Sequence, residues 1–280
     1  MIAQNFDYAA PKTLDEALGL LANENAKALA GGQSLIPIMK LRFAAPDQVV
    51  DLGRIADLNY IREEGGQIRI GAMTTHYEIE SSALLRRACP LLAEVAHHIG
   101  DTQVRNMGTI GGSTAHADPA ADYPAALFAL EAKLTLVKAG SERTVTVDEF
   151  FVDTFTTALE PGELIKEILL PVEQNGTGTS YQKVQHPASG FAVVGIAARV
   201  HKSGDKINWA RIGVTGLAGK GFRATAVETA VTFGAVEDAA AKVADGVDAN
   251  SDLYASSEYR SHLAKVYTAR AIRQAIQRAS

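Results

Sequence analysis

The segments AGGQSL (residues 30–35) and TIGGSTAHADPAAD (residues 109–122) decide how this chain is interpreted. Each places two adjacent glycines beside hydroxyl or amide side chains and interrupts an apolar stretch. Adjacent glycines let the backbone come close to a ligand and turn its N–H groups toward an anion. A single Gly-Gly pair is most often only a tight turn. Two such loops of different composition indicate a diphosphate that is held from two sides.

The common nucleotide-binding signatures are absent from the sequence. It contains no G-x-x-x-x-G-K-[ST], which excludes the phosphate-binding loop of the nucleotide hydrolases. No G-x-G-x-x-G follows a predicted strand, so the ordinary dinucleotide-binding fingerprint is also missing. Gly219 and Gly221 form an isolated G-x-G near Arg223, which we interpret as a turn.

Length and composition predict a folded chain with a sizeable core, because 47% of its 280 residues are hydrophobic. A net charge of −5 without a basic cluster argues against nucleic acid or an anionic membrane as the partner. The sequence shows neither a signal peptide pattern nor an apolar run of membrane-spanning length. The single cysteine, Cys89, excludes an internal disulfide, and we expect it to be a buried hydrophobic residue. We therefore expect a cytoplasmic protein.

Hydrophobic periodicity and turn residues predict alternating helices and strands. Thr13 and Glu16 have the spacing of a capping box, which predicts a helix over residues 13–21. Gly65 and Gly66 predict the turn of a hairpin over residues 60–71, and NGTGT (residues 175–179) is the clearest linker. Further helices are expected at 33–42, 90–99, 122–130 and through most of 223–278, and further strands at 27–30, 48–52, 133–138, 144–147, 164–170, 181–185, 191–201 and 207–217.

Four segments carry a family resemblance: AGGQSLIPIMKLR (30–42), IREEGGQIRIGAMTTH (61–76), TIGGSTAHADPAAD (109–122) and EPGELIKEILLP (160–171). In this order they resemble the FAD-binding medium subunit of molybdenum hydroxylases, the family of xanthine dehydrogenase and aerobic carbon monoxide dehydrogenase. The resemblance implies an α+β chain with an FAD-binding fold of the p-cresol methylhydroxylase type. FAD would lie between two α/β subdomains, followed by a three-stranded antiparallel sheet with helices. We expect these units at residues 1–52, 53–172 and 173–280.

The same resemblance assigns residues to FAD. Residues 30–34 match the segment whose amides hold the pyrophosphate, and residues 109–113 match the second phosphate-facing segment. The carbon monoxide dehydrogenase pattern has GGN where this chain has Gly111, Gly112 and Ser113, so the serine keeps a donor but loses the reach of the amide. The implied cofactor-binding residues are Leu29, Ala30, Gly31, Gly32, Gln33, Ser34, Leu35, Thr109, Ile110, Gly111, Gly112, Ser113, His116, Asp122, Leu164, Ile165, Lys183 and Phe191.

Some of these assignments have an alternative. Asp122 matches an acidic residue near the FAD, and it also stands at a predicted helix N-cap. His116 is expected to lie near the cofactor. Together with Asp118 and Asp122 it also forms an H-x-D-x-x-x-D pattern, but this spacing is not specific for metal ligands, and we expect no metal ion here. Lys183 matches a lysine toward the pyrimidine end of the flavin, where a cation raises the flavin potential; the alternative is a solvated strand lysine. Phe191 matches a position that holds tyrosine in some carbon monoxide dehydrogenases. A phenylalanine there can still stack on the flavin ring, but it lacks the hydroxyl that could form a hydrogen bond.

No pattern indicates a nucleophile or catalytic base of the chain's own, so we expect the chemistry to be that of the flavin. The resemblance implies an electron-transfer subunit that accepts electrons from the 2Fe–2S clusters of a small iron–sulfur subunit. A large molybdopterin subunit would complete a heterohexamer, a dimer of heterotrimers. One alternative is a self-sufficient FAD-dependent oxidase or NAD(P)H-dependent reductase, against which the small C-terminal unit argues. The other is a binding module without FAD, against which the intact glycine loops argue.

Overall fold

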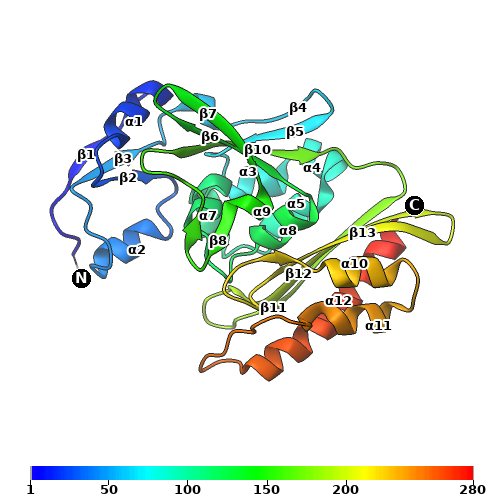
Figure 1. Ribbon diagram of the computed structural model, residues 1–280. Helices are drawn as coiled ribbons and strands as arrows, with labels where there is room; N and C mark the ends of the chain where they lie inside the picture. Colours follow the sequence, from blue (N-terminus) through cyan, green and yellow to red (C-terminus); the bar gives the residue numbers. More distant parts are fainter. Residues whose placement is uncertain (1, 280) are drawn as a thin grey trace.

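The computed structural model describes residues 2–279 and contains three main β-sheets (Figure 1). The first is parallel, in the order β1 (Asp7–Ala9), β3 (Gln48–Asp51) and β2 (Ala26–Leu29). The second is antiparallel, in the order β4 (Ile61–Glu64), β5 (Gln67–Gly71), β10 (Leu164–Pro171), β6 (Lys133–Lys138) and β7 (Ser141–Thr146). The third is antiparallel, in the order β11 (Thr177–Gln185), β12 (Ala192–Ser203), β13 (Lys206–Thr215) and β14 (Phe222–Arg223). A small ribbon pairs β8 (Phe151–Asp153) with β9 (Thr156–Thr157).

Helices connect the strands of these sheets. Those before the second glycine-rich segment are α1 (Leu14–Leu21), α2 (Leu35–Lys40), the 3-10 turn η1 (Ala56–Leu58), α3 (His76–Ser81), α4 (Ala83–Ala88), α5 (Pro90–His97) and α6 (Thr102–Met107). Those after it are α7 (Ile110–His116), α8 (Tyr123–Ala129), α9 (Val147–Phe150), α10 (Thr225–Val231), α11 (Val236–Ala240), the 3-10 turn η2 (Ala241–Ala244) and α12 (Ser257–Arg278). No helix within residues 2–279 has the length and apolarity that crossing a membrane requires.

The N-terminal elements follow from local sequence signals. Thr13 accepts a hydrogen bond from the Glu16 N–H and the Glu16 carboxylate accepts one in return, so the predicted capping box starts α1. Helix α2 is shorter than the predicted 33–42. It starts late because Gly32 takes a left-handed backbone (φ 71°), and Arg42 just beyond its end is left-handed as well (φ 63°). The first glycine-rich segment is therefore an open loop between β2 and α2.

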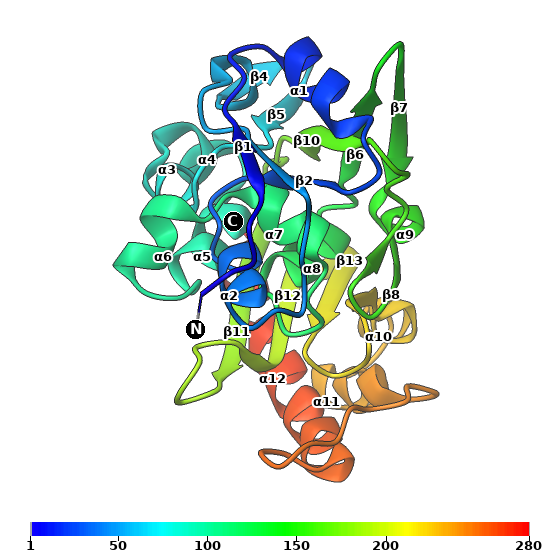
Figure 2. The same ribbon diagram turned by 90° about the vertical axis from the view of Figure 1, so that its left-hand side faces the viewer.

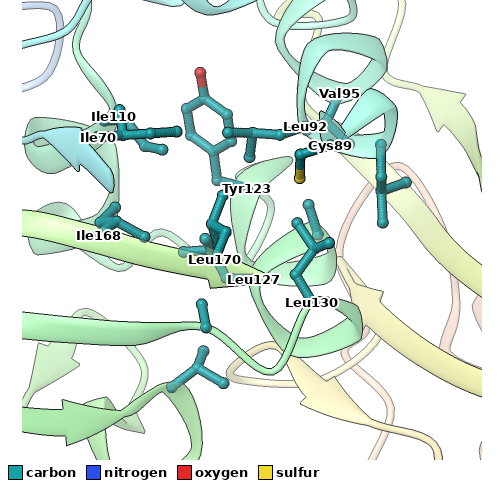
Figure 3. Packing of buried hydrophobic residues seen from close by; sticks show 14 of the residues in the cluster. Ile70, Cys89, Leu92, Val95, Ile110, Tyr123, Leu127, Leu130, Ile168 and Leu170 are labelled. Atoms are coloured by element: carbon teal, nitrogen blue, oxygen red, sulfur yellow. The ribbon is translucent and has the colours of Figure 1, made fainter. Parts of the chain in front are cut away.

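The largest apolar core lies between the five-stranded sheet and helices α3, α4, α5, α7 and α8. All residues of α8 are buried, because this helix also packs against β12 and β13 of the third sheet. Figure 3 shows the ring of Tyr123 among the labelled aliphatic side chains, with its hydroxyl pointing out of the cluster. Cys89 is fully buried in this core, and burial raises its pKa to about 12, so the thiol stays protonated as expected for a packing residue.

The third sheet differs from the expected three strands. The two residues of β14 add a fourth strand beside the end of β13, pairing Phe222 with Val214 and Arg223 with Gly213. The expected linker 175–179 is also partly wrong, because β11 already starts at Thr177. Helices α10 and α12 cover the face opposite to α8 (Figure 1), and together they enclose a second apolar core.

Candidate functional site

A cavity of about 910 Å³ lies between the N-terminal parallel sheet and the central part of the chain. In Figure 2 the first sheet and α2 lie in front of α7. Residues from both of these parts line the cavity. It also reaches the turn between β11 and β12 and the turn before β10. All predicted cofactor residues line it except Leu29, Ile110 and Lys183. Leu29 packs behind Gly32, and Ile110 is completely buried in the core.

The first glycine loop, residues 30–35, presents backbone amides without protein partners. Within residues 2–279, the N–H groups of Gly31, Gly32, Gln33 and Ser34 donate to no other group, although all four residues line the cavity. A Cβ atom on Gly31 would overlap the carbonyl oxygen of Met107, so only glycine allows this loop to touch the segment before α7. Successive free amides at a cavity wall form a site for an anionic group such as a diphosphate.

The sequence predicts that the amides of the second glycine loop, residues 109–113, also face the anion, but the structure shows a different arrangement. Thr109 caps α7 by accepting the Gly112 N–H at 3.0 Å. The N–H of Ile110 donates to Thr74 O (3.0 Å), and that of Gly111 donates to Ala72 O (2.9 Å). The Ser113 N–H donates to Thr109 O (3.0 Å). These amides are therefore committed to the protein, and this loop is a fixed wall beside the first.

A buried charge pair stands at one side of the cavity. Asp122 lines the cavity but is only 5% exposed, and its Oδ1 accepts from the Tyr181 hydroxyl (2.6 Å) and the Lys183 Nζ (2.8 Å). Nζ also donates to His98 O (3.0 Å). Burial raises the pKa of Asp122, while the bonds from Lys183 and Tyr181 act in the opposite direction. Asp122 thus stays beside a compensating cation.

The alternative roles that the sequence suggested for Asp122 and Lys183, a helix cap and a solvated strand lysine, are both wrong. Asp122 occupies the N-cap position of α8, but its side chain caps no N–H because it is held by Lys183 and Tyr181 instead. Lys183 is not a solvated strand lysine, since its side chain is only 2% exposed. It does not line the cavity either, so the group that faces the cavity is the carboxylate.

The remaining predicted residues lie around the cavity. Leu164 and Ile165 start β10 and are largely buried. His116 ends α7, with its ring 5.2 Å from that of Phe155. Phe191 is 42% exposed in the turn between β11 and β12. In residues 2–279, no three His, Cys, Asp or Glu side chains converge as ligands of a metal ion.

Sequence reasoning missed His76, which lines the cavity from the first turn of α3. Its ring is buried and its Nδ1 lies 3.0 Å from the Tyr123 hydroxyl. Burial and the nearby charge of Arg105 lower its pKa to about 4. The capping box of Thr75 and Glu78 was a readable signal for a helix start at this position.

Comparison with known proteins assigns the family. Residues 4–173 match the model for the FAD binding domain in molybdopterin dehydrogenase, and residues 179–275 match the carbon monoxide dehydrogenase flavoprotein C-terminal domain. The chain is 40% identical to the carbon monoxide dehydrogenase medium chain of Hydrogenophaga pseudoflava, over 98% of each chain. It is 39% identical to the glyceraldehyde dehydrogenase medium chain of Sulfolobus acidocaldarius, over 98% of this chain and 99% of the other.

Solved structures agree with this assignment. A medium-chain structure of carbon monoxide dehydrogenase from Hydrogenophaga pseudoflava superimposes with a TM-score of 0.95 at 41% identity, covering both chains completely. A chain of quinoline 2-oxidoreductase from Pseudomonas putida 86 gives a TM-score of 0.94 at 30% identity, over 100% of this chain and 99% of the other. The expected family and fold are confirmed: the chain belongs to the FAD-binding flavoprotein subunits of the molybdenum-dependent dehydrogenases, with FAD as its cofactor.

Proposed function

We propose that this chain carries electrons from the 2Fe–2S clusters of a small partner subunit to an external acceptor within a molybdenum hydroxylase complex. The observation that supports this proposal best is a run of four amides that have no acceptor within residues 2–279, at the wall of a cavity of about 910 Å³ in a chain of this family. FAD supplies one- and two-electron redox chemistry when bound. The chain supplies binding and electrostatic tuning.

Each part of the cavity has a proposed task. The amides of Gly31 to Ser34 bind the diphosphate, and the backbone of Met107 and Gly108, just before the second loop, supports them through its contact with Gly31. Leu164, Ile165 and Phe191 supply apolar surface for the isoalloxazine. The carboxylate of Asp122 accepts hydrogen bonds from the cofactor, while Lys183 compensates its charge.

The partners we propose are the small iron–sulfur subunit and the large molybdopterin subunit, arranged as a dimer of heterotrimers. Relatives of this chain carry the name medium chain, which fits a complex with a larger and a smaller subunit. Phe155 and Phe191 are 56% and 42% exposed at or beside the cavity. Exposed aromatic residues at such a place are typical of a protein interface. We also propose units at residues 1–52, 53–172 and 173–280, since each of the three sheets falls within one of these ranges.

FAD is expected to be bound without a covalent link. The glycine loops hold no cysteine or tyrosine, and His116 is the one histidine in residues 109–122. Precipitation of the purified chain with acid should therefore release all of the yellow colour as FAD. Colour that stays in the pellet, or FMN in the supernatant, would contradict this expectation.

The function itself is tested by reconstitution. We expect the isolated chain to bind FAD but to oxidise none of the substrates of the complex. Adding the iron–sulfur and molybdopterin subunits should restore substrate-dependent bleaching of the flavin absorbance. Turnover by the isolated chain at the rate of the complex would instead support the self-sufficient oxidase.

A further inference from the structure

His76 is placed by main-chain contacts at the point where the two glycine loops meet. Its N–H donates to Gly108 O (3.0 Å), and Thr75 forms a β-bridge with Thr109. A Cβ atom on Gly108 would lie 2.5 Å from the His76 Nε2, so glycine at this position makes room for the ring. The backbone of Met107 and Gly108 is also what Gly31 touches. The imidazole edge therefore lies beside the contact between the loops.

The two ring nitrogens of His76 have different surroundings. Nδ1 lies 3.0 Å from the hydroxyl of Tyr123, which is fully buried. Within residues 2–279, Nε2 has no hydrogen-bond partner, and it is not among the polar atoms that the protein encloses completely. Because His76 lines the cavity and its Nδ1 is engaged by Tyr123, Nε2 is the ring nitrogen that is available to a molecule bound there.

The hydroxyl of Tyr123 determines the tautomer of this histidine. Among residues 2–279, Nδ1 is the only hydrogen-bond partner of that hydroxyl. If Nδ1 carried the proton and donated it, the phenolic proton would be buried without an acceptor, which is unfavourable. The phenol therefore donates to Nδ1 (Figure 3 shows the hydroxyl pointing out of the aliphatic cluster), and a neutral ring must carry its proton on Nε2.

Two further features, independent of the hydrogen bond to Tyr123, keep the His76 ring neutral. It is only 4% exposed, and the charge of Arg105 lies nearby. Both lower its pKa to about 4, so at neutral pH it holds a single proton. The geometry of Tyr123 then decides where that proton is.

We infer that His76 is a neutral hydrogen-bond donor to an oxygen of bound FAD through Nε2–H, and that Tyr123 is the positioning residue that holds this tautomer. The inference deepens the proposed FAD site and rests on it. It adds a side-chain donor from α3 to the main-chain donors of the first loop. It also gives a role to Tyr123, a polar group placed at the edge of an otherwise apolar core.

The tautomer is measured on the wild-type full-length chain, labelled with ¹⁵N-histidine, by NMR. We expect a pyridine-type Nδ1 and a pyrrole-type Nε2 for His76, and a change of the Nε2–H signals when FAD is added. Tyr123→Phe should remove the preference for this tautomer. A pyrrole-type Nδ1 in the wild type, or an Nε2 that FAD leaves unchanged, would overturn the inference.

Affinity gives an independent readout, from the Kd for FAD measured by flavin fluorescence. His76→Phe should weaken binding by about tenfold or more, as expected for a lost hydrogen bond. His76→Gln, which keeps a neutral N–H donor, should recover part of this loss. The matched control is His201→Phe, because His201 stacks on Trp209 in the third sheet outside the cavity, and its Kd should be unchanged.

The outcomes separate the inference from the FAD site on which it rests. An unchanged Kd in a folded His76→Phe chain would refute the role of His76 and leave the site intact. Failure of the wild-type chain to bind FAD at all would refute the site itself.

Discussion

The two glycine loops share a Gly-Gly pair in their sequences but have different roles in the structure. In the first, the amides of Gly31 to Ser34 have no protein acceptor within residues 2–279, and Gly32 is left-handed at φ 71°. In the second, the amides of residues 110–113 all donate to main-chain or side-chain oxygens nearby. The difference arises because the second loop is the capped start of α7, whereas residues 30–34 of the first loop lie outside any helix or strand.

This comparison teaches that adjacent glycines serve two separate needs. In the first loop they leave donors free for a ligand and give the backbone a left-handed turn. In the second loop they allow close packing, because a Cβ on Gly111 would lie 2.5 Å from the Cβ of Ala72 and one on Gly112 would lie 3.2 Å from the Cβ of Ala30. The hydrogen-bond donors to FAD should therefore come from the first loop, while the second loop supports the first by close packing.

The largest effect is expected where the two loops touch. Gly31→Val should weaken FAD binding by about 100-fold or more, since the new Cβ would overlap the main chain of Met107 and Gly108 and push the first loop away from the segment that leads into the second. The measurement is the Kd for FAD together with the melting temperature. The matched control is Gly19→Val, because among residues 2–279 no atom outside the adjoining turns of α1 lies within 4 Å of a Cβ at this exposed position. Equal Kd values for the two variants would contradict the contact.

A second pair of variants separates the loops directly. Gly32→Val should weaken FAD binding by about 20-fold, because a β-branched residue is strained at φ 71°. Gly112→Val should have a smaller effect, about fivefold, because its Cβ meets only Thr109 Oγ1 at 3.0 Å and Ala30 Cβ at 3.2 Å. Gly32→Asn should be milder than Gly32→Val, since asparagine tolerates the left-handed region. The reverse order of Gly32→Val and Gly112→Val would show that the second loop carries the main donors.

The last prediction concerns the stability of the fold instead of FAD affinity, through pH and the histidine beside the second loop. The folded-state pKa of His76 is about 4, below the ordinary 6.5, so the unfolded chain takes up this proton first as the pH falls. The stability of the fold should therefore decrease below about pH 6.5. Between pH 7.5 and pH 5 this residue should remove about 2 kcal/mol from the free energy of unfolding.

The control for this measurement is the variant His76→Phe. The pKa values of Asp122 and Glu173 are raised by burial, so protonation of these groups on acidification changes stability in the opposite direction. Urea unfolding of both chains at the two pH values isolates the contribution of His76 as a difference. A wild-type chain that loses no more stability than His76→Phe would show that the ring is not buried as a neutral group.

The sequence alone determined the local features of this fold. The capping box of Thr13 and Glu16, the hairpin turn at Gly65 and Gly66, and the start of α5 at Pro90 lie where the sequence predicts them. Each depends on residues a few positions apart, for which propensity and hydrogen bonding act within one segment. The glycine loops were also predicted, and most of the residues that the family resemblance assigns to FAD line the cavity.

Only the tertiary structure decided how these residues are used. The partners of Asp122 come from residues 59 and 61 positions away, Tyr181 and Lys183, and no local pattern predicts that they replace a helix cap. The position and tautomer of the His76 ring depend on Tyr123 and Gly108, which lie outside α3. Whether an amide is free or paired depends on oxygens that are distant in sequence, such as those of Ala72 and Thr74. The physical reason is that burial and hydrogen-bond satisfaction belong to the packed chain as a whole, whereas a sequence motif records only its own residues.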